Sequence, residues 1–271
     1  MLRAVHDTVW AFDLEWVPDT AAGRALYGLP DDADDRAVCE AMWRAAGATP
    51  DNPRPFLKTA LCRLASAALV QRRVTDGEVR VDLCSLPRPG DDPADEAALL
   101  RTLLDAVGRY RPQLVGFNSR SADLHLLVQR GVAQGLHAPG LCRQGARPYD
   151  GVNYFYRYGD AHVDLMEVLG GRGSRAVSLR EMAVLVGLPA KPPASGRSVA
   201  DLWLDGRYDE VVAYNEGDAV TTYLLWLRTA HFAGRFTAEA YARERALVEA
   251  MLRRAAEAGK EHLEAFLPVL A

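Results

Sequence analysis

Short apolar runs alternate along this chain with longer segments in which apolar residues recur at helical spacing. The runs predict β-strands, and the longer segments predict helices. The predicted strands cover residues 8–14, 57–70, 77–86 and 113–119, and a turn at 75–77 joins the second to the third. The predicted helices cover residues 94–110, 123–130, 178–188 and 207–232, with a short element at 162–169. Strands that alternate with helices indicate the α/β class, with a mixed central sheet flanked by helices.

Two regions stand apart from this alternation. Residues 17–55 hold the acidic run DDADD and the proline-rich run TPDNPRP, which predict a surface insertion with one short helix near 36–46. The tail predicts a further amphipathic helix. We therefore expect one domain over residues 1–235, with a C-terminal helical extension over 236–271 packed on the same domain.

Composition narrows the class of protein. Of the 271 residues, 49% are apolar and 25% are charged, which is typical of a globular protein with a sizeable core. No apolar run reaches the roughly 20 residues of a membrane span, and no export signal is visible. The four cysteines are scattered, so we expect reduced thiols, a cytoplasmic location and no membrane partner. The net charge of −4 argues against nonspecific binding of long DNA and fits a small or delivered substrate.

The strand at 8–14 runs into two carboxylates, Asp13 and Glu15. Residues two apart on a strand share one face, whereas Leu14 is directed the other way. Two carboxylates about 4 Å apart repel by about 4 kcal/mol at an effective dielectric constant near 20. A divalent cation would offset that repulsion, although two solvent-facing residues at a strand end would carry the same pattern.

Two later segments carry further carboxylates. Asp123 opens a helix directly after the strand at 113–119, where it is either a helix cap or a ligand. Tyr214 and Asp218 share one face of the helix at 207–232, and that face is either solvated or part of a site. Carboxylates from a strand end, a helix start and a late helix could converge. Such a set would supply oxygen ligands for two divalent cations, Mg²⁺ or Mn²⁺.

The carboxylates lie in three short motifs, which are, in chain order, FDLE, FNSRSAD and YNEGD. They resemble the motifs of the tyrosine-containing subgroup of the DEDD exonucleases, which have the ribonuclease-H-like fold. The sequence is most similar to predicted 3′→5′ exonucleases related to the proofreading domain of family B DNA polymerases, and the resemblance spans roughly residues 8–231. Three neighbouring positions depart from the usual pattern, namely Trp16, Ala122 and Asn215, and none of them removes a carboxylate.

The resemblance implies a role for each matched residue. Asp13 would bridge two metal ions, Glu15 and Asp218 would complete one metal site, and Asp123 would serve the other through water. Tyr214 would orient the attacking water and contact substrate. The resemblance also implies a substrate contact at Leu14, Asn118 and Lys191. Lys191 would be either a point charge for a phosphate or a solvated loop lysine.

The sequence therefore predicts a metal-dependent 3′→5′ exonuclease acting on single-stranded nucleic acid, with DNA favoured over RNA by analogy and protein partners unknown. Two alternatives stay open, namely an exoribonuclease or oligonucleotidase, and a catalytically silent nucleic-acid-binding protein. Asp164 is either a further site carboxylate or, the favoured interpretation, a structural hydrogen-bond acceptor. The segment 143–158 mixes arginines with aromatic residues, so it is either a single-strand-binding surface or a cover for the core.

Overall fold

A five-stranded mixed sheet forms the centre of the protein in the computed structural model, which describes residues 2–143, 145–147, 150–170, 176–189 and 198–270. The strand order is β3-β2-β1-β4-β5. The strands are β1 (Thr8–Pro18), β2 (Cys62–Thr75), β3 (Glu78–Leu86), β4 (Gln113–Gly116) and β5 (His162–Asp164). The first three strands pair antiparallel, whereas β1–β4 and β4–β5 pair parallel. The expected α/β class with a mixed sheet flanked by helices is confirmed.

The hairpin between β2 and β3 turns where the sequence predicts it. Asp76 and Gly77 both have positive φ, at 53° and 81°. Two successive residues of positive φ match the right-handed twist of the flanking strands, and Asp-Gly is one of the pairs that tolerates them. The turn therefore fixes the register in which Thr75 pairs with Glu78.

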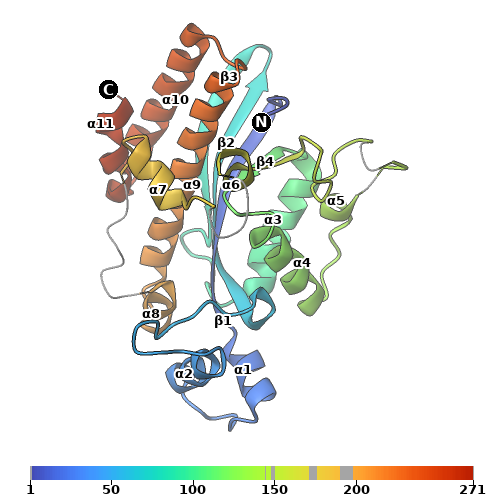
Figure 1. The fold of residues 1–271 in the computed structure, drawn as a ribbon, viewed down its shortest axis with the longest axis vertical. Helices are drawn as coiled ribbons and strands as arrows, with labels where there is room; N and C mark the ends of the chain where they lie inside the picture. Colours follow the sequence, from blue (N-terminus) through green and yellow to red (C-terminus); the bar gives the residue numbers. More distant parts are fainter. Residues whose placement is uncertain (1, 144, 148–149, 171–175, 190–197, 271) are drawn as a thin grey trace.

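Helices cover both faces of the sheet (Figure 1). One face packs against α9 (Tyr208–Phe232) and α10 (Ala238–Glu257), and the other against α3 (Glu96–Tyr110) and α4 (Asp123–Ala133). Successive side chains of β1 point to opposite faces of the sheet, so β1 contributes to the core on each face. Val9 and Ala11 join the core beneath α9, whereas the core beneath α3 and α4 receives Trp10, Phe12 and Leu14.

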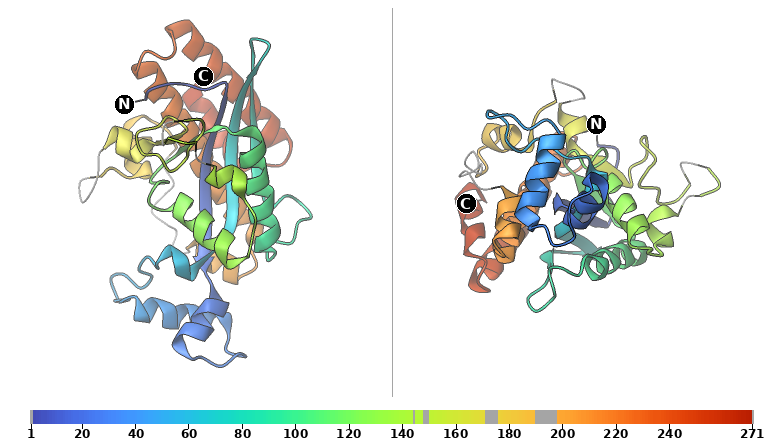
Figure 2. Two further views of the ribbon diagram at one scale, coloured as in Figure 1. Left: turned by 90° about the vertical axis from the view of Figure 1, so that its right-hand side faces the viewer. Right: turned by 90° about the horizontal axis from the view of Figure 1, so that it is seen from below.

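The expected surface insertion is more structured than its composition indicates. It contains α1 (Thr20–Tyr27) as well as α2 (Asp35–Ala45), and the sequence reading missed α1. In the views of Figure 2 this helix pair lies at one end of the molecule, beyond the end of β1. Cys39 and Trp43 of α2 are buried in a small core together with Ala200 and Val211. Residue 200 belongs to α8 (Val199–Leu204), a second helix that was not predicted.

The remaining elements are all short. They are η1 (Thr59–Leu61), α5 (Pro139–Cys142), α6 (Leu165–Leu169), α7 (Leu179–Leu185), η2 (Glu261–Phe266) and α11 (Leu267–Leu270). Buried residues of α10 and η2 join the core of the sheet, and the division into a domain and an extension stays a prediction. Within the described residues, no helix combines the length and apolar character that crossing a membrane requires.

Candidate active site

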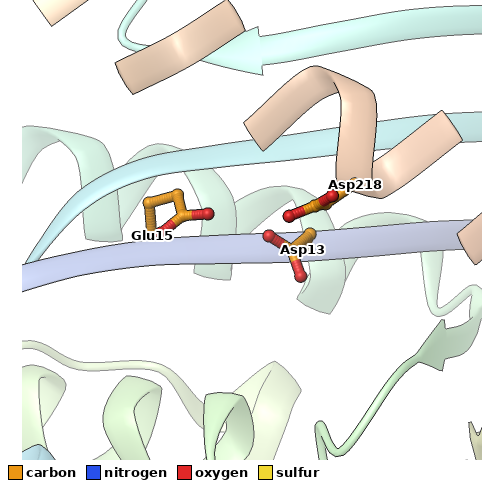
Figure 3. Close-up of side chains that lie close together, drawn as sticks. All are labelled: Asp13, Glu15 and Asp218. Carbon is orange, nitrogen blue, oxygen red and sulfur yellow. The ribbon is translucent and has the colours of Figure 1, made fainter. Parts of the chain in front are cut away.

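Three carboxylates from two elements meet beside the sheet. Asp13 and Glu15 continue the face of β1 that carries Val9 and Ala11, and that face is covered by α9. Asp218 lies on α9, which packs across β1 and β2. Figure 3 shows Asp218 reaching toward Asp13, with Glu15 farther along the strand. One carboxylate oxygen from each of the three lies within 4.8 Å of the others, and all three residues are half-buried.

This donor set suits a hard divalent cation. Mg²⁺ and Mn²⁺ prefer oxygen ligands, and carboxylates are the ligands that proteins supply to them. Like charges this close repel each other, so a cation between them would stabilise the arrangement. The residues present therefore fit the metal site that the sequence predicts at Asp13, Glu15 and Asp218.

Tyr214 lies one helical turn before Asp218 on the same face of α9. Burial raises the pKa of the Tyr214 hydroxyl above its ordinary value, and the negative charges of Asp218, Glu15 and Asp13 raise it further. The three carboxylates are therefore near enough to Tyr214 to affect its hydroxyl electrostatically. Without a bound cation, the Tyr214 hydroxyl is therefore protonated at neutral pH and can donate a hydrogen bond.

Asp123 lies outside this cluster, although it contacts the same strand. Strand β4 pairs with β1 only as far as Ala11. Beyond that point the Asp123 carboxylate accepts a hydrogen bond from the backbone N–H of Leu14, between the two cluster residues of β1. Burial raises the pKa of Asp123 to about 7, opposed by hydrogen bonds from its own N–H and that of Leu14. Its role at a second cation stays a prediction.

Asp164 holds the loop after β4 in place. Its carboxylate accepts hydrogen bonds of 3.0 Å from the backbone N–H groups of Asn118, Arg120 and Met166. The structural interpretation favoured from the sequence agrees with these bonds. Asn118 has a φ of 59°, a left-handed conformation that asparagine tolerates better than most residues. The substrate contact expected at Asn118 stays a prediction.

A cleft of about 450 Å³ opens beside the carboxylates, lined by Asp13, Glu15 and Asp218 themselves. Leu14 also lines it, although Leu14 is only 3% exposed and packs mainly into the core beneath α3 and α4. Lys191 lies outside the described residues. The cleft is also lined by residues that the sequence did not single out, namely Trp43, Arg54, Phe56 and Leu179, and by Phe117 of the FNSRSAD motif. The sequence marked this part of the cleft only by the pair of prolines that flanks Arg54.

The aromatic and basic segment at 143–158 divides between the two expected roles. Tyr154 is fully buried in the core, and its hydroxyl donates to the backbone oxygen of Pro112 at 3.0 Å. Tyr158 is 63% exposed. None of the described residues of this segment lines the carboxylate cleft. Tyr154 therefore covers the core, and a nucleic-acid contact by the exposed residues stays a prediction.

Comparison with known proteins gives one family. None of the curated proteins matched the chain. A family model described as predicted 3′-5′ exonucleases related to the exonuclease domain of PolB matches residues 54–269. The matched span includes Asp123, Tyr214 and Asp218, whereas Asp13 and Glu15 precede it and are joined to Asp218 by the fold. Because the match covers well over half of its length, the chain belongs to this family of predicted 3′-5′ exonucleases.

Proposed function

We propose that this protein is a metal-dependent 3′→5′ exonuclease that hydrolyses single-stranded nucleic acid, with two divalent cations and a preference for DNA. The single observation that supports this most is the meeting of Asp13, Glu15 and Asp218 within 4.8 Å. In a family of predicted exonucleases, a cluster of oxygen donors beside an open cleft is the expected arrangement for phosphodiester hydrolysis.

The chain's own residues have separable tasks in this proposal. Asp13, Glu15 and Asp218 hold a cation, and Asp123 serves a second one from its position on the Leu14 amide. Divalent cations in such sites lower the pKa of bound water and stabilise charge on the leaving oxygen. Tyr214, which stays protonated, donates a hydrogen bond that orients the attacking water. The walls of the cleft hold the strand end in line with these groups.

The test is degradation of single-stranded DNA and RNA, each labelled at the 5′ or the 3′ end, with Mg²⁺, Mn²⁺ or EDTA. We expect mononucleotides to be released progressively from the 3′ end, faster from DNA than from RNA, and only with a divalent cation. Asp13→Ala should abolish release, because one ligand is removed and the others are left repelling each other. Cleavage that persists in EDTA or in Asp13→Ala would refute the proposal.

Three other outcomes would replace parts of the proposal. Loss of label only from the 5′ end would overturn the polarity, and faster hydrolysis of RNA would favour the exoribonuclease alternative. Tight binding without turnover under every metal would favour a silent binding protein. Cation binding is checked separately by thermal melting. Mn²⁺ should raise the melting temperature of the wild-type protein and not that of Asp13→Ala, since a ligand that binds only the folded state stabilises it.

A further inference from the structure

The cleft that contains the carboxylates is also lined by the loop between α2 and η1 and by the start of α8. We propose that this loop is a single-strand clamp in which Phe56 stacks on an unpaired base and Arg54 binds a backbone phosphate near the 3′ end. The clamp rests on the proposed function, because it takes the carboxylate cluster to be the reaction centre. It adds a substrate-binding role for a region that composition indicates to be an acidic surface insertion.

Phe56 carries the first part of the argument. Its side chain is 97% exposed, more than any other large hydrophobic residue described, and it lines the same cleft as Asp13 and Asp218. The loop that carries it is anchored on both sides. Leu57 packs into the core, and Pro55 restricts the backbone just before Phe56. The exposure of this phenylalanine is therefore set by a fixed loop, and a fixed exposed aromatic beside a reaction centre is suited to stacking.

Arg54 is held at the same wall by three contacts. Its Nη1 forms an ion pair with Asp201 of α8 and lies 3.4 Å from the Ser198 hydroxyl. The guanidinium lies over the Trp43 ring, 5.3 Å from the centroid. Among the described residues that line the cleft, Arg54 supplies the only positive charge. The chain thus orients one guanidinium in a cleft whose proposed ligand is a polyanion.

The clamp selects unpaired strands for a geometric reason. A single strand exposes the faces of its bases, and stacking on an aromatic side chain tolerates any base. In a duplex those faces are covered by neighbouring base pairs. An anchored phenylalanine in the cleft therefore favours a frayed or single-stranded end, and Arg54 adds an electrostatic contact that is independent of base identity.

The test of stacking measures binding apart from hydrolysis. In an Asp218→Asn background with Mn²⁺, the affinity for a fluorescein-labelled ten-residue deoxythymidine oligonucleotide is measured by anisotropy. We expect Phe56→Ala to weaken binding by roughly 10-fold and Phe56→Trp to retain it. Phe232→Ala is the matched control, because Phe232 is 79% exposed at the end of α9 and does not line the cleft.

An oligonucleotide with abasic sites at its three 3′-terminal positions isolates the base contact. The wild-type loop should bind it roughly 10-fold less tightly than the intact oligonucleotide, and Phe56→Ala should cause no further loss. A loss from Phe56→Ala that is equally large on the abasic oligonucleotide would overturn stacking, as would unchanged binding of the intact one. Thermal melting checks that each variant folds.

Arg54 is tested by the salt dependence of binding. Arg54→Gln should reduce the slope of log affinity against log salt by about 0.7, the value for one phosphate contact on a single strand. Arg36→Gln is the control. Nη1 of Arg36 lies 3.6 Å from Oδ1 of the same Asp201, and Arg36 does not line the cleft. An unchanged slope in Arg54→Gln would remove the phosphate contact from the proposal.

The clamp and the proposed function fail in different ways. If the wild-type protein hydrolyses single strands while Phe56→Ala has an unchanged KM, the clamp is wrong and the exonuclease proposal stands. If Phe56→Ala weakens binding but the wild-type protein hydrolyses no strand, the binding surface is real and the proposed activity is wrong. If the wild-type protein neither binds nor cleaves single strands, both proposals fail.

Discussion

The two faces of α9 use their carboxylates in opposite ways. Glu216 is 1% exposed on the face that meets the C-terminal region, and it accepts hydrogen bonds from Ser85, Lys260 and His262. Although burial opposes it, these hydrogen bonds hold the pKa of Glu216 below its ordinary value. Two residues later, Asp218 faces β1 and lies within 4.8 Å of the oxygens of Asp13 and Glu15.

The same contrast holds elsewhere in the protein. Buried Glu96 binds Arg130 through both carboxylate oxygens, at 2.8 and 2.6 Å, and Oε1 of buried Glu244 accepts two hydrogen bonds from Arg72. At these places the fold satisfies a buried acid with a cation from its own chain, as a stable interior requires. The cleft instead gathers like charges from β1 and α9. At that spacing the three carboxylates repel each other, and a bound divalent cation would offset the repulsion.

The largest expected effect separates the two faces directly. Asp218→Asn removes a proposed cation ligand and keeps the shape of the side chain, so we expect about 10³-fold lower exonuclease activity with a melting temperature in EDTA close to that of the wild type. Glu216→Gln should do the reverse. It leaves Lys260 and His262 without their anionic partner and lowers the free energy of unfolding by about 2 kcal/mol, with activity within about twofold of wild type. Activity assays and urea unfolding of both variants provide the measurement.

The contrast between the two faces of α9 is wrong if Asp218→Asn and Glu216→Gln have the same effects on activity and stability. Substantial destabilisation by Asp218→Asn in EDTA would mean that Asp218 has a structural role like that of Glu216. A large activity loss in Glu216→Gln at full stability would place the Glu216 network in catalysis. Either result would remove the division of α9 into a core face and a site face.

Asp123 belongs neither to the buried acids that are paired with cations nor to the carboxylate cluster. The pH dependence of its ionisation gives a further test of this comparison. Burial raises its folded pKa to about 7 from an ordinary 3.8. Between these values the folded protein retains a proton that the unfolded chain has released. The free energy of unfolding in EDTA should therefore fall by about 2 kcal/mol as the pH rises from 5 to 7. Urea unfolding at both pH values measures this fall.

Asp123→Asn is the matched control for that slope, because the amide keeps the shape of the side chain and cannot ionise. Burial also lowers the pKa of His162 to about 3, which gives a stability that falls as the pH drops below 6.5. That contribution is present in both proteins and cancels in their difference. Parallel pH dependence of wild type and Asp123→Asn would show that Asp123 is ionised at pH 5, as an acid stabilised by its surroundings would be.

The sequence predicts the carboxylate cluster because its geometry is mostly local. Alternation along β1 places Asp13 and Glu15 on one face, and helical spacing places Tyr214 one turn from Asp218. The meeting of these pairs depends on α9 crossing β1, which no local pattern determines. The position of Asp123 depends on where β4 stops pairing with β1, and the sequence places the end of β4 three residues too late, at 119 instead of Gly116.

The cleft wall was harder to predict for a different reason. Helix α8, which contributes to that wall, is only six residues long, too short for periodicity to distinguish it from a loop. Arg54 is placed by Asp201, which lies 147 residues later in the chain. Such a contact follows from the packing of α2 against α8, so it becomes visible only once the chain is folded.

The smallest expected effect concerns Tyr214, which shares the site face of α9 with Asp218. If Tyr214 only donates a hydrogen bond that orients water, Tyr214→Phe should lower kcat by about 10-fold and leave stability unchanged, since the side chain is 40% exposed. Burial is the largest cause that raises the pKa of Tyr214, and it acts whether or not the carboxylates hold cations, so we expect the hydroxyl to stay protonated in the assay. The ratio of wild-type to Tyr214→Phe rates should therefore be constant from pH 7 to pH 10. A ratio that grows with pH would identify a tyrosinate acting as a base, and Tyr214 would then be a proton acceptor in the reaction.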